Sequence, residues 1–282
     1  VALREHAEGG VLGSRGYGRP QLRAPCVSSC HTKERSYESP DAKAPEELTT
    51  HVRRIARAMH VRNPDRIEVF ISRGFSSVSG GCALWPNGAV IGVPRTFLFR
   101  NRSDVERSGL RLQNEDIDWN SDIGQKLAHL LVPSAQEMNF RIAHELAHVE
   151  LLDPLVKVPL ASTALVASYH LALVAPRFLP RLANTGFPLM FGAGLFVYLQ
   201  LSSALGRWME FRADRRAALC KKSYTEGGID FMRKSIELES VLQPSTQISI
   251  SQLISSLSHH PDHQERLDKL EKLLFITNWD FN

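Results

Sequence analysis

The stretch that decides the fold is RIAHELAHVE, at residues 141–150. It contains a His-Glu-x-x-His pattern within a segment that has helical character. Residues four apart lie on the same face of a helix, so His144 and His148 can direct their imidazole nitrogens to one point. Zn²⁺ binds such nitrogens at about 2.0–2.1 Å, and a catalytic zinc site usually has three protein ligands and a water molecule. The stretch therefore predicts a zinc centre in which Glu145 lies beside that water.

The helix that carries this pattern has clear boundaries. Ser134 and Glu137 form a capping box, in which each side chain can satisfy the other residue's free backbone N–H. Pro154 is expected to end the helix, because a proline disfavours the helical conformation of the residue before it. Between these boundaries the apolar residues recur at helical spacing: Met138, Ile142, Leu146 and Val149. The two histidines are thus predicted to stand well inside a helix.

Two apolar stretches follow, at residues 158–175 and 187–205. The first contains one strongly polar residue, His170, and the second contains one, Gln200. Each stretch is near the minimum length for crossing a bilayer, and a loop with prolines and arginines separates them. The pattern predicts a membrane hairpin at 155–205; the alternative is a pair of buried core helices in a soluble protein. Two crossings return the chain to the side that it left, so the sequence after the hairpin faces the same compartment as the histidines.

A third zinc ligand can come from the sequence RWMEFRADRR, at residues 207–216. Glu210 and Asp214 are four residues apart and lie on one face of a predicted helix. Glu210 can complete a site with two histidines and one glutamate. Asp214 lies one turn further on, where it can orient a ligand imidazole or a nearby arginine. The alternative is a solvated helix face, on which two acids at this spacing are common.

A further candidate segment is SHHPDHQERL, at residues 258–267. Pro261 suits the first turn of a helix, where its missing N–H is not needed. His260 then stands at the entrance of that helix and can face the metal pocket, with Arg266 further along. The alternative is a surface helix whose histidines titrate near neutral pH.

The sequence before the motif predicts a helix and a small sheet. An amphipathic helix is predicted over residues 46–60 from its apolar spacing, and a strand over 66–71. Two further strands, at 82–85 and 89–93, flank a Pro-Asn-Gly turn, in which Asn-Gly suits a tight hairpin. Residues 1–45 lack hydrophobic periodicity and are expected to be disordered.

Two other segments carry weaker patterns. Residues 100–121 are charged and poorly patterned, and they are predicted to form a surface loop. Gly227 and Gly228 are predicted to end one helix, so that residues 229–242 form another. Apart from the N-terminal segment, the chain is interpreted as one domain over residues 46–282.

The composition excludes some function classes. The formal charge of +4 over 282 residues comes without a dense basic run interleaved with aromatic residues. Nucleic acid is therefore not expected as a partner. The four cysteines are too few and too scattered to indicate a disulfide framework.

The order of these motifs resembles the membrane metallopeptidase family that includes HtpX and the CAAX prenyl protease. The resemblance extends over about residues 46–275. It implies an α+β, mainly helical zincin-type fold with a small β-sheet, in which the transmembrane hairpin separates the two ligand helices. It also implies one Zn²⁺ per chain. The implied site consists of the zinc ligands His144, His148 and Glu210, the catalytic residues Glu145 and His260, and the supporting residues Asp214 and Arg266.

A second resemblance is to the transmembrane protein 177 family. It rests on IGVPRTFL at residues 91–98, on Asp118-Trp119 and on EGGIDF at residues 226–231. Members of that family are proteins of the mitochondrial inner membrane that help to assemble cytochrome c oxidase. The resemblance implies this location and, as partners, respiratory-chain assembly proteins.

Two functions from different classes follow. The first is a zinc-dependent membrane metalloendopeptidase that hydrolyses peptide bonds of membrane or membrane-proximal proteins, with a protein or peptide substrate and the lipid bilayer as partners. The alternative is a mitochondrial inner-membrane assembly factor that stabilises cytochrome c oxidase subunit II and has a structural or vestigial zinc site. The presence of Glu145 beside three candidate ligands favours the peptidase, because a scaffold has no physical need for a general base there.

Overall fold

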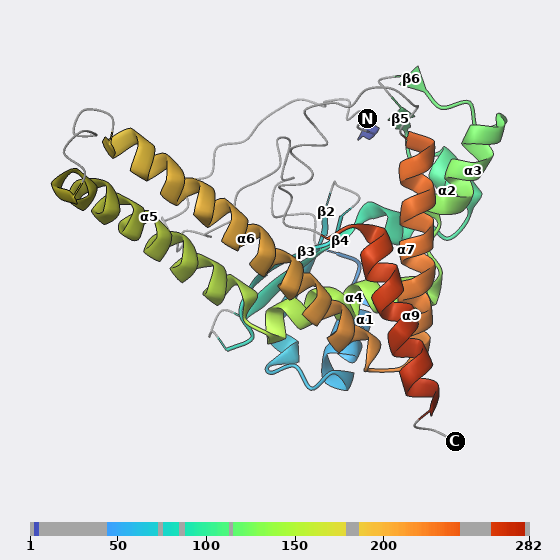
Figure 1. The fold of residues 1–282 in the computed structure, drawn as a ribbon. Helices are drawn as coiled ribbons and strands as arrows, with labels where there is room; N and C mark the ends of the chain where they lie inside the picture. The colour runs from blue at the N-terminus through green and yellow to red at the C-terminus, as the bar shows by residue number, and fades with distance from the viewer. Residues whose placement is uncertain are drawn as a thin grey trace, which may run out of the picture.

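Two long helices, α5 (Asp153–Phe178) and α6 (Gly186–Ala218), run side by side and project from a mainly helical body (Figure 1). The structure is a computed structural model. It describes residues 3–5, 44–72, 76–84, 88–112, 115–178, 186–242 and 261–279. The predicted α+β fold is confirmed: helices dominate, and the strands form small sheets. The predicted disorder of residues 1–45 falls mostly outside the described residues and stays a prediction.

The sheet next to the motif helix has three strands: β2 (Ile67–Ser72), β4 (Ala89–Pro94) and β3 (Val78–Gly81). They lie in that order, with β2 parallel and β3 antiparallel to β4. The predicted strands at 66–71 and 89–93 are confirmed. The strand predicted at 82–85 is wrong, because β3 ends at Gly81 and a turn follows it. Ala83 and Leu84 form this turn, and Trp85 lies outside the described residues.

The predicted turn before β4 falls partly outside the described residues, which resume at Gly88. This glycine has φ +74°, and a Cβ on it would lie 2.2 Å from the Arg66 carbonyl oxygen. Only glycine adopts this conformation at such a distance without strain. The short 3-10 helix η1 (Pro64–Arg66) thereby packs against the start of β4.

The prediction of a surface loop at residues 100–121 is wrong. This segment contains the helix α2 (Arg102–Glu106) and the strands β5 (Leu110–Leu112) and β6 (Glu115–Asp116), which form a second sheet with β1 (Leu3–Glu5). Val105 and Leu110 of this segment form a satellite core with Phe99 and with Ala128 and Leu131 of the helix α3 (Asp122–Leu131). Because this packing joins residues far apart in the sequence, no local periodicity indicates it.

The helix α1 (Glu46–Ala58) confirms the prediction over 46–60. Its apolar face buries Val52 and Ile55 completely or nearly so, against α4 (Ala135–Glu150) and β2. The remaining short elements before α4 are η2 (Arg95–Leu98) and α3 (Asp122–Leu131). The predicted capping box at the start of α4 is present, with Ser134 and Glu137 exchanging hydrogen bonds of 3.2 Å.

The predicted helix break at residues 227–228 is wrong, because α7 (Lys222–Leu242) runs continuously through both glycines. A Cβ on Gly227 would lie 2.3 Å from the carbonyl carbon of Gln136, and one on Gly228 would lie 2.7 Å from the Phe140 ring. The glycines therefore allow α7 to approach α4 closely. The last helix, α9 (His263–Trp279), packs along α7 and α6.

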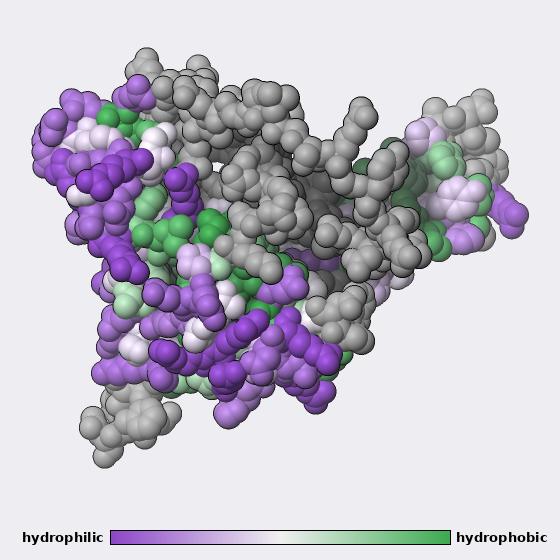
Figure 2. All heavy atoms as spheres, turned by 180° about the vertical axis from the view of Figure 1, so that it is seen from behind, coloured by the Kyte–Doolittle hydropathy of each residue, from purple (hydrophilic) through white to green (hydrophobic). Residues whose placement is uncertain are grey.

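The projecting hairpin is apolar and exposed. Two helical segments are long and apolar enough to cross a membrane, Leu155–Val174 and Phe187–Ala218, and only 11% of each apolar window is buried. Core helices of a soluble protein would be mostly buried, so the exposure of these segments argues against that alternative. In Figure 2 purple side chains predominate along the side and lower part of the body, and green side chains appear along the projecting arm as well as in the middle of the body. These observations support the predicted membrane hairpin.

Candidate metal centre

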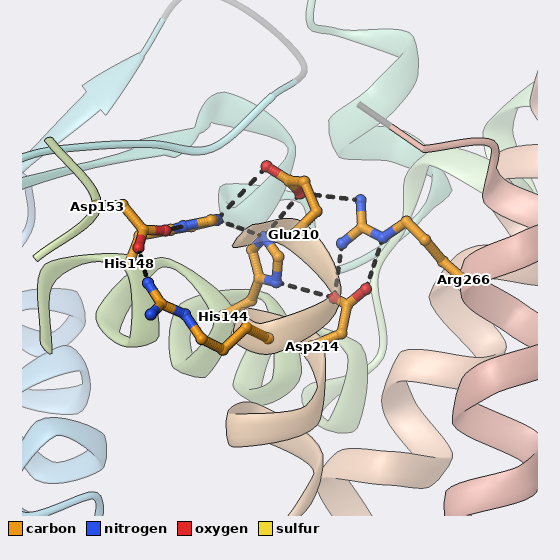
Figure 3. Close-up of polar contacts among 7 residues, drawn as sticks. His144, His148, Asp153, Glu210, Asp214 and Arg266 are labelled. Atoms are coloured by element: carbon orange, nitrogen blue, oxygen red, sulfur yellow. Dashed lines mark hydrogen bonds and ion pairs between the residues drawn. The ribbon is translucent and has the colours of Figure 1, made fainter. Parts of the chain in front are cut away.

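The helices α4 and α6 bring together two histidines and one glutamate at the base of the hairpin (Figure 3). The Nε2 atoms of His144 and His148 lie 3.1 Å apart. The carboxylate of Glu210 lies 3.4 Å from the first nitrogen and 3.6 Å from the second. All three side chains thus direct a possible ligand atom to one point, as the sequence predicts.

Local structure explains this convergence. His144 and His148 are separated by one turn of α4, and their rings meet edge to face with centroids 4.7 Å apart. Glu210 lies in the last part of α6, which packs across α4 after the hairpin has returned to the body. His144 and Glu210 are 8% and 6% exposed, so these two side chains are largely shielded from bulk solvent.

Both imidazoles are held from behind by carboxylates. The Nδ1 atom of His144 lies 2.9 Å from Asp214, and that of His148 lies 2.5 Å from Asp153. The Asp214 contact lies off the N–H direction of the ring, so it is an ion pair rather than an aligned hydrogen bond. A carboxylate on Nδ1 leaves Nε2 free to bind a metal ion. The donor set and its orientation therefore fit Zn²⁺.

Asp214 contacts an arginine as well as a histidine, so the structure places it against both of its predicted partners. Arg266 of α9 donates two hydrogen bonds of 2.7 Å to its carboxylate. A third contact, of 3.4 Å, joins Arg266 to Glu210. Arg266 is itself buried, and these two carboxylates raise its pKa although burial acts in the opposite direction.

Asp153 was not predicted from the sequence as part of the site. It is the first residue of α5 and only 2% exposed, and it contacts both His148 and Arg212 of α6. From the sequence, Pro154 is assigned only the role of ending the preceding helix, and the residue before it is assigned no role. The available signal was an acidic residue that immediately precedes this proline, five positions after His148.

Glu145 lies between the two histidines in sequence and is 8% exposed. Its negative charge acts to raise the pKa values of Arg266 and of Arg141. Arg141 is enclosed by the rings of Phe97 and Phe231, at 4.8 and 4.7 Å from the ring centroids. Burial lowers the pKa of Arg141 to about 10, and Glu145 partly opposes this shift.

The pKa of His144 is strongly raised. Burial alone would lower it, but the carboxylates of Asp214 and Glu210 raise it to about 10. Without a cation, His144 therefore carries a proton at neutral pH. A metal ion must displace that proton, because only the neutral imidazole is a ligand.

The predicted site residue His260 lies outside the described residues, and its role stays a prediction. The structure describes the chain again from Pro261, which is buried. The helix α9 begins only at His263, so the prediction that Pro261 lies in the first helical turn is wrong. The backbone N–H of Arg266 donates to the carbonyl of Asp262, which places the helix entrance after the proline.

Comparison with known proteins shows similarity to two groups. The chain matches Peptidase family M48 over residues 44–274. It is 26% identical to transmembrane protein 177 of Danio rerio over 76% of this chain and 73% of that protein. The corresponding protein of Xenopus laevis is 28% identical, over 62% and 59%. The human protein is 26% identical, over 68% and 64%, so the match spans less than two thirds of the frog and human relatives. No solved structure matches the chain.

Proposed function

The chain belongs to peptidase family M48, and we propose on this basis that it is a zinc-dependent membrane metalloendopeptidase. It is a membrane protein, as its two exposed apolar helices and its transmembrane relatives indicate. The proposed substrates are peptide bonds of membrane or membrane-proximal proteins, because the site lies at the base of the hairpin.

One observation carries this proposal. Three possible ligand atoms of His144, His148 and Glu210 lie within 4.8 Å of one another. Each histidine is oriented by a carboxylate on its other nitrogen. Solvated helix faces do not bring such groups together in a buried site, because burying charged groups without a compensating partner is costly.

The residues of the chain have distinct roles in the proposed reaction. When bound, zinc lowers the pKa of its water towards about 7 and polarises the scissile carbonyl. The Glu145 carboxylate accepts a proton from the attacking water and then donates it to the leaving amine. Arg266 is already bound to Asp214 and Glu210, so we assign it a role in holding these carboxylates. The proposed role of His260 is at the transition-state oxyanion, as the family resemblance implies.

The second candidate is an assembly factor of the mitochondrial inner membrane. Its support is the similarity to proteins named transmembrane protein 177 rather than to a named peptidase. On this proposal the same residues form a structural or vestigial zinc site, and the partners are respiratory-chain assembly proteins. Glu145→Gln would then leave function intact.

Cleavage of peptide bonds distinguishes the two candidate functions. The wild-type protein and the Glu145→Gln variant would be reconstituted in bilayers with a pool of membrane proteins, and new protein termini would be identified by mass spectrometry. We expect termini that appear with the wild type and are absent with Glu145→Gln. The control is Glu47→Gln, at an exposed residue of α1 far from the site. Equal termini in wild type and Glu145→Gln would contradict the proposed role of Glu145.

A further inference from the structure

Asp153 connects the metal centre to both helices of the hairpin. It is the first residue of α5, and its Oδ2 atom lies 2.5 Å from Nδ1 of His148 on α4. Its Oδ1 atom accepts a hydrogen bond from Arg212 of α6. The single buried carboxylate of Asp153 therefore connects α4, which carries the two histidines, to the base of both hairpin helices, α5 and α6 (Figure 3).

Arg212 lies on α6 shortly after the end of the apolar stretch, and contacts with neighbouring groups hold its side chain in place. Its guanidinium lies 4.3 Å from the Trp208 ring centroid, and it also donates to the Leu151 carbonyl at 3.3 Å. Trp208 is 53% exposed and lies three residues after the end of the apolar stretch at residue 205. Tryptophan is enriched at bilayer interfaces. At 1.5 Å per residue, Arg212 lies about 6 Å along the helix from that level.

The connection between α4 and α5 is short. Only Leu151 and Leu152 separate Glu150, the last residue of α4, from Asp153. Leu152 has φ +60°, a conformation that a leucine keeps only when its surroundings fix it. Asp153 belongs to α5 and His148 to α4, so a change in the angle between these two helices alters the position of the Asp153 carboxylate relative to His148.

We propose that Asp153 and Arg212 are positioning residues that make zinc affinity depend on how the hairpin is seated in the bilayer. Asp153 fixes the tautomer and ring orientation of His148, so that Nε2 faces the metal. Arg212 holds Asp153 in place from the second hairpin helix. The inference rests on the zinc site of the proposed function but requires no peptidase activity.

The first test is zinc affinity, measured in nanodiscs by competition with a chromophoric chelator. Loss of an outer-shell partner typically costs about 10–100-fold in metal affinity, and we expect a loss in this range for Asp153→Asn. Arg212→Gln should lose less, since Asp153 keeps its contact with His148. Both variants should also change the visible absorption spectrum of the Co²⁺-loaded protein, which reports ligand geometry and would not respond to a general loss of stability.

The matched control is Arg216→Gln. Arg216 lies one turn further along α6, and it binds Glu150 of α4 at 2.9 Å and the Met59 carbonyl at 2.7 Å. It therefore also ties α6 to α4, but it does not contact His148. Substitutions at independent sites leave each other's energetics nearly unchanged, so zinc affinity should stay within about twofold of wild type.

The second test varies the bilayer. Helices tilt when their apolar length differs from the thickness of the hydrocarbon core, at a modest cost per Å. A change of about 4 Å in thickness should therefore alter the wild-type dissociation constant for zinc by roughly fivefold. The same change should have little effect on Asp153→Asn, in which the connection is already weakened.

Several results would overturn the inference. The first is an Asp153→Asn variant that keeps the zinc affinity and the Co²⁺ spectrum of the wild type. The second is an equal loss of zinc affinity in Arg216→Gln and Arg212→Gln. The third is a zinc affinity of the wild type that does not depend on bilayer thickness. If Asp153→Asn does not fold, as judged by circular dichroism, Arg212→Gln and the thickness series decide the question. Absence of zinc from the wild type would instead overturn the proposed function, and this inference with it.

Discussion

The hairpin and the metal centre at its base are built in opposite ways. The hairpin exposes large apolar side chains along both helices, and its helices pack through small contacts such as Gly194 on Ser168. The metal centre buries histidines, acids and arginines, each paired with another charged group. The hairpin surface suits an apolar surrounding such as lipid, whereas the centre depends on mutual compensation of charge. We therefore expect substitutions to reduce the stability of the protein less in the hairpin than in the metal centre.

The largest effect is expected from Arg266→Ala. It leaves Asp214 and Glu210 buried without their cation, and breaking a buried ion pair costs about 3–5 kcal/mol. Arg233→Ala is the control, because its pair with Glu271 is exposed and worth about 0–1 kcal/mol. Denaturant unfolding of the detergent-solubilised protein measures both. Equal losses would contradict the difference between buried and exposed pairs.

A smaller effect is expected from Gly227→Ala. The added Cβ would meet the Gln136 backbone at 2.3 Å, and overpacking of this kind costs about 1–3 kcal/mol. In the hairpin, a Cβ on Gly192 meets nothing within 4 Å, so Gly192→Ala should have little effect on stability. Thermal unfolding followed by circular dichroism compares the two variants. A larger loss in Gly192→Ala would reverse the comparison between body and hairpin.

The smallest effect is a dependence of zinc affinity on pH. The pKa of His144 is about 10 without metal, and zinc requires the unprotonated ring. Raising the pH by one unit, from about 6.5 to about 7.5, therefore removes competing protons and should tighten zinc binding about tenfold, or roughly 1.4 kcal/mol. Chelator competition across this range measures the slope. The control is His170→Gln, in the hairpin, which should keep the same dependence of zinc affinity on pH. A wild-type zinc affinity that does not change with pH would contradict the displacement of a proton from His144.

Sequence patterns anticipated the parts of the molecule that depend on local order. The capping box of Ser134 and Glu137 fixes the start of α4, and the four-residue spacing of its histidines fixes their common face. The pair Glu210 and Asp214 could be recognised for the same reason. Hydropathy alone indicated the hairpin, because a bilayer demands long apolar stretches.

The remaining features depend on contacts between distant segments. The glycines at 227–228 resemble a helix end in sequence, and only the close approach of α4 explains them inside α7. The packing of Val105 and Leu110 on α3 leaves no periodic pattern in a charged segment. Asp153 lies only five residues after His148, but its second contact, with Arg212 of α6, joins segments that are distant in the sequence.

The most direct test of the central claim is the zinc content of the purified, detergent-solubilised protein. Wild type, His148→Ala and Glu145→Gln would be compared by elemental analysis, with metal loss during purification excluded by reloading. We expect about one zinc per chain in wild type and in Glu145→Gln, and none in His148→Ala, since a catalytic site needs three protein ligands. Wild-type protein that binds no zinc, even after reloading, would contradict the central claim.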